Sequence, residues 1–386
     1  MSIQGEIMIS LNCDTKGISS EITSSRPMKA AQLFSGKTIE QTLKTVPLLF
    51  NICSKAQAVT VVRAVESATD SAVDDSVESQ REAIVMIESL REHSLQILMK
   101  WPDYIDEALN NEALSKCVQS LNKLIQSFEP QKILHFGIQN SESVTAQQCA
   151  LWSQCEEQLS NTIFGLPIAQ WQQDDHDAVL HWASLQNTQA ARFLYWLNQQ
   201  GWKYAGNSEI LLLPEIDDAE LVTRLMQEQE HFTAQPDWHS NRYEASWFNY
   251  QQDNLIIKQL DTEFGKGIYT RMVARLIEVA DLITKLKQFF QSERVFKKPR
   301  SIVKGLAHTD AARGRLSHYV QVGSGIVKRL FILAPTEWNF HPKGVAADSL
   351  CHLDDSIALR LQADLLIHAI DPCVGYRLHI NNEVIH

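Results

Sequence analysis

The stretch LLIHAIDPCVGYRLH, residues 365–379, decides how the end of this chain is built. Apolar residues at positions i, i+3 and i+4 predict a helix over residues 357–369. The Asp-Pro step that follows should end this helix, because proline disfavours helical conformation in the residue before it. Cys373 comes next, and Tyr376 and His379 follow at intervals of three. A Cys-x-x-Cys-x-x-His ending would offer two thiolates and an imidazole, whereas this ending offers one thiolate.

The composition is that of a large globular protein, and it argues against binding to nucleic acids and against a membrane span. The 386 residues are 44% hydrophobic, which allows a large core, and the formal net charge of -11 opposes binding to phosphate backbones. The sequence contains no run of about 20 apolar residues that could span a bilayer. The N-terminus lacks a basic region followed by an apolar one, as a secretory signal would have. We therefore expect a cytoplasmic protein with no nucleic-acid partner and no membrane span.

The seven cysteines are scattered and odd in number, so the chain does not have a disulfide framework and its thiols should be reduced. Cys149 and Cys155 lie six residues apart on a predicted helix. This spacing favours buried helical cysteines over a zinc site, which would have a Cys-x2-Cys pair. Phosphate-loop, dinucleotide-binding, serine-hydrolase and zinc-protease motifs are all missing from the sequence. These features alone indicate a helical protein of unknown role.

The hydrophobic pattern predicts an α+β fold that is predominantly helical. Short apolar runs at residues 6–14 and 326–334 are typical of strands. Most of the sequence between them has helical periodicity, and residues 264–292 predict a long amphipathic helix. No internal repeat, low-complexity tract or flexible linker divides the chain. We expect a single domain over residues 1–386.

Three phrases together resemble the large subunit of nickel–iron hydrogenases. The ending LLIHAIDPCVGYRLH is similar to that family's terminal helix, whose I/V-H-x-x-DPC phrase presents a Cys-x-x-Cys-x-x-His. AARGRLSHYVQV at 311–322, followed by FILAPTEWNFHPKG at 331–344, is similar to the family's PRG-x-L-x-HW strand and P-S/T-x-WN phrase. The segment at 34–66, which ends in VRAVE, aligns with the segment that carries R-x-C-G-x-C-x-x-x-H. The motif-bearing segments are 26–69 and 305–379, and the resemblance implies a large-subunit-like helical core with small peripheral antiparallel sheets.

In that family two cysteine pairs far apart in the sequence meet around nickel and iron, which are soft metals that suit thiolates. The first cysteine of each pair is terminal on nickel, and the second bridges both metals. At the N-terminal pair of this chain, the first cysteine position holds Phe50 and the second holds Cys53. The preceding arginine is replaced by Leu48, and the following histidine by Gln57.

At the C-terminal pair the first cysteine is kept as Cys373, the second is replaced by Tyr376, and the histidine is kept as His379. Two thiolates therefore remain of four, and we expect no nickel. Arg313 matches the arginine that overhangs the metals in the enzymes. The acid that acts as a proton gate is replaced by Ala31, which cannot relay a proton.

A shared architecture with an incomplete metal site resembles the large-subunit-like maturation proteins of the HupK/HoxV type. TQAARFLYWLNQQGW at 188–202 and APTEWNFHPKG at 334–344 are also similar to that group. The resemblance implies a scaffold, not an enzyme, that transiently holds the Fe(CN)2(CO) unit during assembly of the hydrogenase large subunit. The implied partners are hydrogenase maturation chaperones and the large-subunit precursor.

On this interpretation Cys53 and Cys373 hold the iron in one shielded pocket, Arg313 hydrogen-bonds a cyanide, and Gln57 and His379 orient a thiolate. Each residue also has a structural interpretation. The cysteines could simply pack in the core, Arg313 could pair with Asp310 or another acid, and His379 could be structural. Two other functions stay open, a residual metal-binding enzyme and a metal-free protein that imitates the large subunit to recruit maturation factors.

Overall fold

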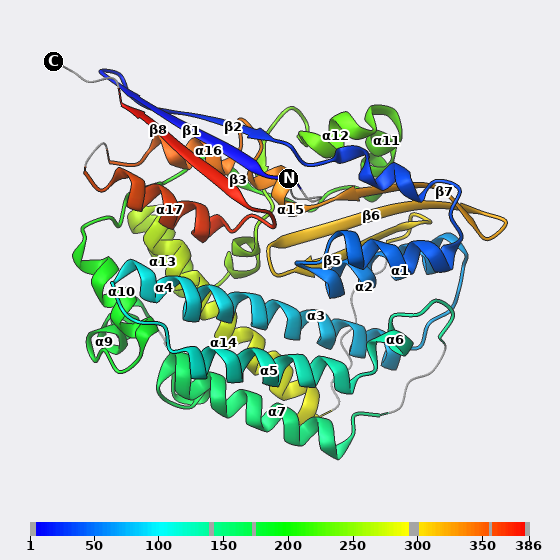
Figure 1. Ribbon diagram of the computed structural model, residues 1–386, viewed down its shortest axis with the longest axis horizontal. Helices are drawn as coiled ribbons and strands as arrows, with labels where there is room; N and C mark the ends of the chain where they lie inside the picture. Colours follow the sequence, from blue (N-terminus) through cyan, green and yellow to red (C-terminus); the bar gives the residue numbers. More distant parts are fainter. Residues whose placement is uncertain (1–4, 139–142, 172–174, 293–300, 355–356, 383–386) are drawn as a thin grey trace.

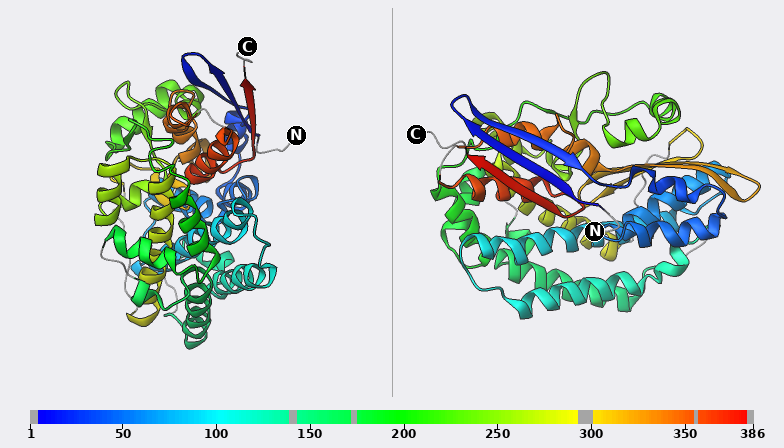
Figure 2. Two further views of the ribbon diagram at one scale, coloured as in Figure 1. Left: turned by 90° about the vertical axis from the view of Figure 1, so that its left-hand side faces the viewer. Right: turned by 45° about the horizontal axis from the view of Figure 1, so that its top comes forward.

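A layer of long helices forms one side of the protein and two small sheets lie on the other (Figures 1 and 2). The computed structural model describes residues 5–138, 143–171, 175–292, 301–354 and 357–382. The helical layer contains α3 (Asp75–Leu95), α5 (Asn111–Ser127), α7 (Ala146–Leu159) and α14 (Ile268–Ser292). The predominantly helical α+β prediction is confirmed, as is the long helix within residues 264–292.

The first sheet is antiparallel and consists of β5 (Leu306–Ala311), β6 (Gly314–Gly323) and β7 (Ile326–Leu333). Helix α2 (Ser54–Ala68) packs against β5 and β6, and α1 (Ile39–Leu49) packs against α2. The apolar side chains between α2 and this sheet form a cluster of their own. This cluster fixes the start of α2 relative to the sheet.

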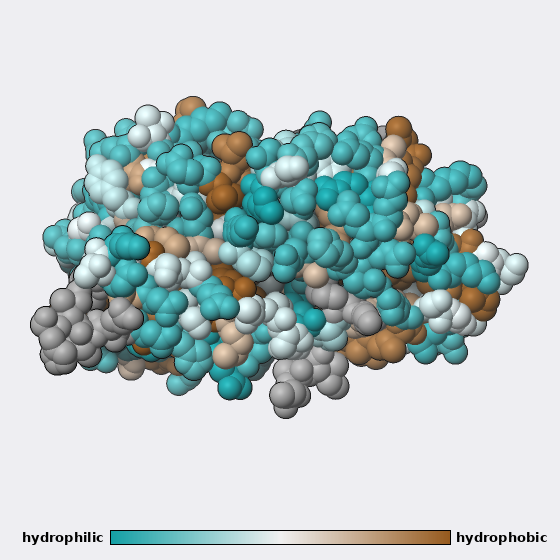
Figure 3. Space-filling view, turned by 90° about the horizontal axis from the view of Figure 1, so that it is seen from above, coloured by the Kyte–Doolittle hydropathy of each residue, from teal (hydrophilic) through white to brown (hydrophobic). Residues whose placement is uncertain are grey.

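The second sheet joins the two ends of the chain, in the order β2–β1–β8. β1 (Ile7–Asp14) pairs antiparallel with β2 (Gly17–Ser24) but parallel with β8 (Tyr376–Asn382). The expectation of antiparallel sheets therefore holds for the pairing of β1 with β2 and is wrong for the pairing of β1 with β8. Residues 357–382 return from the helical core to lie beside the first strand, and a parallel partner cannot be deduced from a strand's own alternation of apolar and polar residues. Viewed from above, this side of the molecule is mostly hydrophilic, with small hydrophobic patches (Figure 3).

Helix α17 (Leu359–Ile370) packs against α14 and brings the C-terminal motif into the core. It ends at Asp371, whose φ of 67° lies in the left-handed region. A non-glycine residue is strained there. The Asp371 carboxylate compensates by accepting a hydrogen bond from Gln96 and pairing with Arg275. The predicted stop after the helix is confirmed, and the ion pair explains why the turn is held in place.

The remaining elements connect these layers. The short helices are α4 (Trp101–Tyr104), α6 (Pro130–Ile133), α8 (Ile168–Trp171), α9 (His176–Ser184), α10 (Gln189–Gln199), α11 (Asp218–Glu228), α12 (Glu230–Ala234), α13 (Leu255–Phe264), α15 (Pro335–Asn339) and α16 (Val345–Cys351). Short 3-10 or π segments are η1 (Met28–Phe34), η2 (Gln96–Lys100), η3 (Ser160–Phe164) and η4 (Trp247–Gln251). The two-residue strands β3 (Leu211–Leu212) and β4 (Tyr243–Glu244) pair in parallel. No helix in the described ranges combines the length and apolar character needed to cross a bilayer.

Candidate metal-unit site

Cys53 lies directly before the first residue of α2. Two backbone N–H groups of this first turn, those of Lys55 and Ala56, donate to the two carboxylate oxygens of Glu88 on α3, each at 2.9 Å. The Glu88 side chain therefore replaces the capping group that a cysteine cannot provide. The start of α2 is anchored to α3, and the position of the Cys53 sulfur is fixed with it.

Cys373 follows the turn at the end of α17, and the Thr336 hydroxyl on α15 contacts both its backbone N–H and its sulfur. The Cys373 backbone N–H donates to Thr336 Oγ1 at 3.2 Å, and the same hydroxyl lies 2.9 Å from Cys373 Sγ, to which it donates. Thr336 was not predicted as a site residue. It is the S/T of the P-S/T-x-WN phrase, so the motif carried a signal that it lies at the site.

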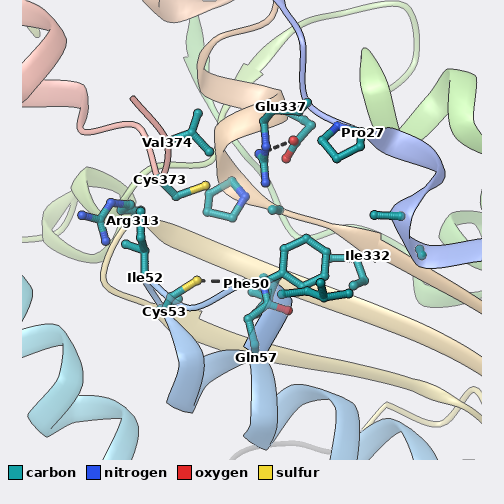
Figure 4. Close-up of a pocket in the computed structure, with 18 of the residues that line it drawn as sticks. Pro27, Phe50, Ile52, Cys53, Gln57, Arg313, Ile332, Glu337, Cys373 and Val374 are labelled. Atoms are coloured by element: carbon teal, nitrogen blue, oxygen red, sulfur yellow. Dashed lines mark hydrogen bonds and ion pairs between the residues drawn. The ribbon is translucent and has the colours of Figure 1, made fainter. Parts of the chain in front are cut away.

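Both cysteines line one cavity of about 380 Å³. Figure 4 shows their side chains projecting into it from opposite walls. The cavity lies where two apolar clusters meet, because Cys53 packs against the cluster under the first sheet and Cys373 against the main helical core. The other lining residues are mostly apolar: Pro27, Ala30, Ala31, Leu33, Leu49, Phe50, Ile52, Ala311, Leu316, Ile332, Ala334, Pro335 and Val374. The polar ones are Arg26, Gln57, Arg313 and Glu337.

Arg313 reaches this cavity from the two-residue turn between β5 and β6. The turn depends on Gly314, which has φ of 124° and whose added Cβ would lie 1.8 Å from the backbone oxygen of Ala245. No other residue fits this close approach. The glycine of the AARG phrase therefore lets the backbone turn at a point where it presses against a neighbouring segment.

The Arg313 guanidinium is buried and paired with two acids. It lies 3.3 Å from Glu92 and 3.4 Å from Asp371. Burial would lower the pKa of Arg313, but the charges of Asp371 and Glu92 raise it above its ordinary value. The ion-pair interpretation is therefore correct, with Glu92 and Asp371 as the acids instead of Asp310. The charged group also lines the cavity, so pairing and ligand contact are compatible.

Gln57 connects Cys53 to a buried histidine. Its amide nitrogen lies 3.9 Å from Cys53 Sγ, and its amide oxygen lies 2.9 Å from His318 Nε2. Burial lowers the pKa of His318 to about 3, so its ring is neutral at physiological pH. The neutral ring can donate only if Nε2 carries the proton. His318 then orients the amide so that its N–H groups face the sulfur.

His379 and Tyr376 are not at the site. His379 lies on β8, opposite Ser10 of β1, with an exposed side chain. The expectation that it orients a thiolate is not supported, because the strand carries it away from the cavity. The Tyr376 hydroxyl donates to Asp364 at 3.1 Å and lies 3.1 Å from His368, outside the cavity lining.

Arg26 and Glu337 are two further polar residues of the cavity that the motif comparison missed. They form a buried ion pair, with side chains 11% and 6% exposed. Arg26 lies at the start of the matched segment 26–69 and Glu337 follows Thr336 in the PTEWN phrase. The sequence could have indicated them, because segments 26–69 and 305–379 were predicted to meet at the site and each contains one of these oppositely charged residues.

The electrostatics of the cavity keep Cys53 protonated. Burial raises the pKa of the Cys53 thiol to about 12, and Cys373 and Glu88 act in the same direction, while Arg313 and Gln57 oppose them. Among the described residues, no group of three or more His, Cys, Asp and Glu side chains could hold a metal ion. The polar groups of the cavity are thus two sulfurs, the guanidinium groups of Arg26 and Arg313, the Gln57 amide and the Glu337 carboxylate.

Comparison with known proteins places this geometry in context. Residues 249–379 match the family model described as nickel-dependent hydrogenase. The hydrogenase expression/formation protein HoxV of Cupriavidus necator is 26% identical over 373 residues, covering 92% of this chain and 91% of that protein. The hydrogenase expression/formation protein HupK of Azotobacter vinelandii is also 26% identical, with 92% of each chain covered.

Among solved structures, the Ni-Fe-Se hydrogenase from D. vulgaris Hildenborough matches with a TM-score of 0.61 at 13% identity, covering 93% of this chain and 94% of that one. At this identity the match concerns the fold alone. The resemblance found in the motifs is confirmed: the chain has the fold of hydrogenase large subunits and is similar over most of its length to hydrogenase expression/formation proteins.

Proposed function

We propose that this chain, a relative of the HoxV and HupK hydrogenase expression/formation proteins with a large-subunit fold, is a maturation scaffold that transiently holds the Fe(CN)2(CO) unit. One observation carries the proposal. Cys53 and Cys373, 320 positions apart in the sequence, project into one mostly apolar cavity. The chain has the fold of a hydrogenase large subunit, and the proteins HoxV and HupK that it resembles over most of its length are named hydrogenase expression/formation proteins.

The cavity suits the chemistry of this iron unit. Low-spin iron with cyanide and carbonyl ligands is a soft centre that favours thiolates. The unit brings three ligands of its own, so it does not need the cluster of three protein ligands that the described residues lack. Carbon monoxide is a poor hydrogen-bond acceptor and suits the apolar walls. The cyanide nitrogens carry negative charge and can accept from guanidinium N–H groups, of which Arg313 offers one set.

Two protein sulfurs also provide a reason for release. Binding must displace the proton of Cys53, whose raised pKa makes this step unfavourable at neutral pH. In the mature large subunit two of the four thiolates bridge the iron to nickel, so we expect the unit to be bound more tightly there. An iron unit can move from one protein to the other only down such a gradient of affinity. Weak binding through two sulfurs is therefore suited to a carrier.

The carrier would act in the cytoplasm, receiving iron from a maturation chaperone and passing it to the large-subunit precursor. It would have no enzymatic activity. Ala31, at the position of the proton gate, lines the cavity as an apolar residue. The carboxylate of Glu337, also in the lining, is paired with Arg26 and so is not available as a free base.

Infrared spectroscopy tests the carrier directly. The protein is purified anaerobically from a host that supplies the maturation factors, and cyanide and carbonyl bands are measured for the wild type, Cys53→Ser and Cys373→Ser. Cys149→Ser is the matched control, since this half-buried cysteine donates to the Phe290 carbonyl and does not line the cavity. We expect bands in the wild type and control, and their loss in both cavity variants.

Other outcomes distinguish the alternatives. Bands that persist in both cavity variants, or no bands in any sample, would overturn the carrier and favour the metal-free protein that recruits maturation factors. Reduction of a dye by the purified wild type under hydrogen would favour the residual enzyme. Each outcome is measured on the same preparations.

A further inference from the structure

Three polar residues, Glu88, Glu92 and Gln96, follow one another at intervals of four along α3 and into η2, the π segment that continues it. This spacing places them on one face of the helix. Helix α3 packs against α2 and β5, which lie above it in Figure 1. The face contacts three different parts of the site, because Glu92 pairs with Arg313 and the two outer residues contact the segments next to the cysteines.

Glu88, at one end of this face, holds the segment that carries Cys53. The Glu88 side chain is buried, and its two carboxylate oxygens each accept a backbone N–H of the first turn of α2, at 2.9 Å. Both bonds are charge-assisted, so they fix the carboxylate and the turn relative to each other. Arg91 Nη2 lies 3.9 Å from Glu88 and 2.9 Å from Glu92, so the two buried acids share one cation. A shift of Cys53 away from α3 would break both bonds to Glu88.

Gln96, at the other end of this face, holds the segment that carries Cys373. The Gln96 amide donates to Asp371 Oδ1 at 3.2 Å, and Asp371 is the left-handed residue two positions before Cys373. Gln96 is also the first residue of η2. Such π segments are rare within helices and often occur at functional sites. The segment of Cys373 is thereby attached to the same continuous helix as the segment of Cys53.

We propose that Glu88 and Gln96 are positioning residues that together set the separation between the Cys53 and Cys373 sulfurs. The two cysteines are 320 positions apart in the sequence and lie on different elements, so nothing local fixes their separation. Helix α3 can fix it, because most of its residues are buried and its backbone hydrogen bonds hold residues eight positions apart at about 12 Å along the helix axis.

A fixed separation matters to a site that binds one metal through two sulfurs. If both sulfurs are already in place, binding does not have to order the two segments that carry them. The inference rests on the proposed function for what the sulfurs hold, but their separation can be measured on the protein without iron.

The test is cross-linking of Cys53 to Cys373 in the reduced, metal-free protein with bis-methanethiosulfonate reagents of increasing spacer length. The yield of the cross-linked peptide pair is measured by mass spectrometry for the wild type, Gln96→Leu and Glu88→Gln. Gln96→Leu nearly keeps the side-chain volume, and Asp371 retains its ion pairs. Glu88→Gln leaves one acceptor oxygen for two N–H donors.

We expect one spacer length to give by far the highest yield in the wild type. In each variant the yield with the adjacent spacer lengths, relative to the best one, should rise by up to about tenfold, because a lost charge-assisted hydrogen bond changes the balance between alternative positions by a factor of this order.

The matched controls carry the same substitutions elsewhere on α3. Gln80→Leu and Glu82→Gln change buried residues that do not line the cavity, and Arg63, the partner of Glu82, keeps Glu78. Both controls should keep the spacer profile of the wild type. Circular dichroism confirms that each variant is folded, and if one cavity-side variant does not fold, the other decides.

Two results would overturn the inference. One is a wild-type spacer profile in the folded Glu88→Gln and Gln96→Leu variants, and the other is no cross-link with any spacer in the wild type. Absence of cyanide and carbonyl infrared bands would instead remove the proposed cargo and leave the measured separation unchanged, so the two failures are distinguishable.

Discussion

The Cys53 thiol should be a far weaker nucleophile in the folded protein than in the unfolded chain. Burial raises its pKa from the ordinary value of 9.0 to about 12. At pH 8 a thiol with the ordinary value is about one-tenth thiolate, whereas one with a pKa of about 12 is thiolate in about one molecule in ten thousand. Because the thiolate is the reactive form, alkylation of Cys53 should slow by about a thousandfold on folding.

The assay compares the same cysteine in two states of the same chain. Iodoacetamide labelling of the Cys53 peptide is followed by mass spectrometry from pH 7 to 11, in native buffer and in concentrated guanidinium chloride. In the unfolded chain the rate should level off above pH 9. In the native protein it should keep rising about tenfold per pH unit through pH 11, because the folded pKa lies higher.

The shape of the profile separates ionisation from access. Poor access to the cavity would slow labelling by the same factor at every pH and leave the midpoint unchanged. A native profile that levels off near pH 9 would refute the reasoning, since it would mean that the cavity does not disfavour the Cys53 thiolate. The proton that we expect the iron unit to displace would then not oppose binding.

Two further predictions concern the amide beside Cys53 and the stability of the fold. His318→Leu should release the Gln57 amide from its orientation and so remove a hydrogen-bond donor from the Cys53 thiolate. Native alkylation of Cys53 should then slow by up to about tenfold at pH 10, while the rate in the unfolded chain stays the same. An unchanged native rate would mean that His318 does not position the amide. Glu244→Gln should lower the free energy of unfolding, measured by urea titration, by about 3–5 kcal/mol. Glu244 and Arg271 form a fully buried ion pair, and the substitution leaves the guanidinium without its counter-charge. A decrease in the free energy of unfolding below about 1 kcal/mol would contradict this.

The sequence predicted the parts of the fold that depend on local periodicity. The long helix within residues 264–292, the C-terminal helix and its stop, and the strand at residues 326–334 all follow from the spacing of apolar residues and from proline. The parallel pairing of β1 with β8 did not follow, because 361 residues separate Asp14, the last residue of β1, from Tyr376, the first of β8, and neither strand encodes its partner's direction. Only the tertiary path of the chain determines that pairing.

The site shows the same division between local and long-range information. Cys53 and Cys373 were predicted to share a pocket because each stands at a motif position, and the structure places both in one cavity. His379 also stands at a motif position, but β8 carries it to the surface beside β1. The motif therefore placed Cys373, just after the turn at Asp371, in the cavity, and it failed only for His379 on β8, where pairing with the N-terminal strand redirects the chain.

Arg26 illustrates why substitutions at a site are easier to detect than additions. The missing thiolates at Phe50 and Tyr376 are visible in the sequence because a motif states what should be there. A buried arginine that lines the cavity with the two remaining cysteines has no motif, and its pairing with Glu337 on α15 follows only from the tertiary structure. The loss of two thiolates can therefore be detected in the sequence, whereas the ion pair of Arg26 with Glu337 in the cavity wall is detected only in the structure.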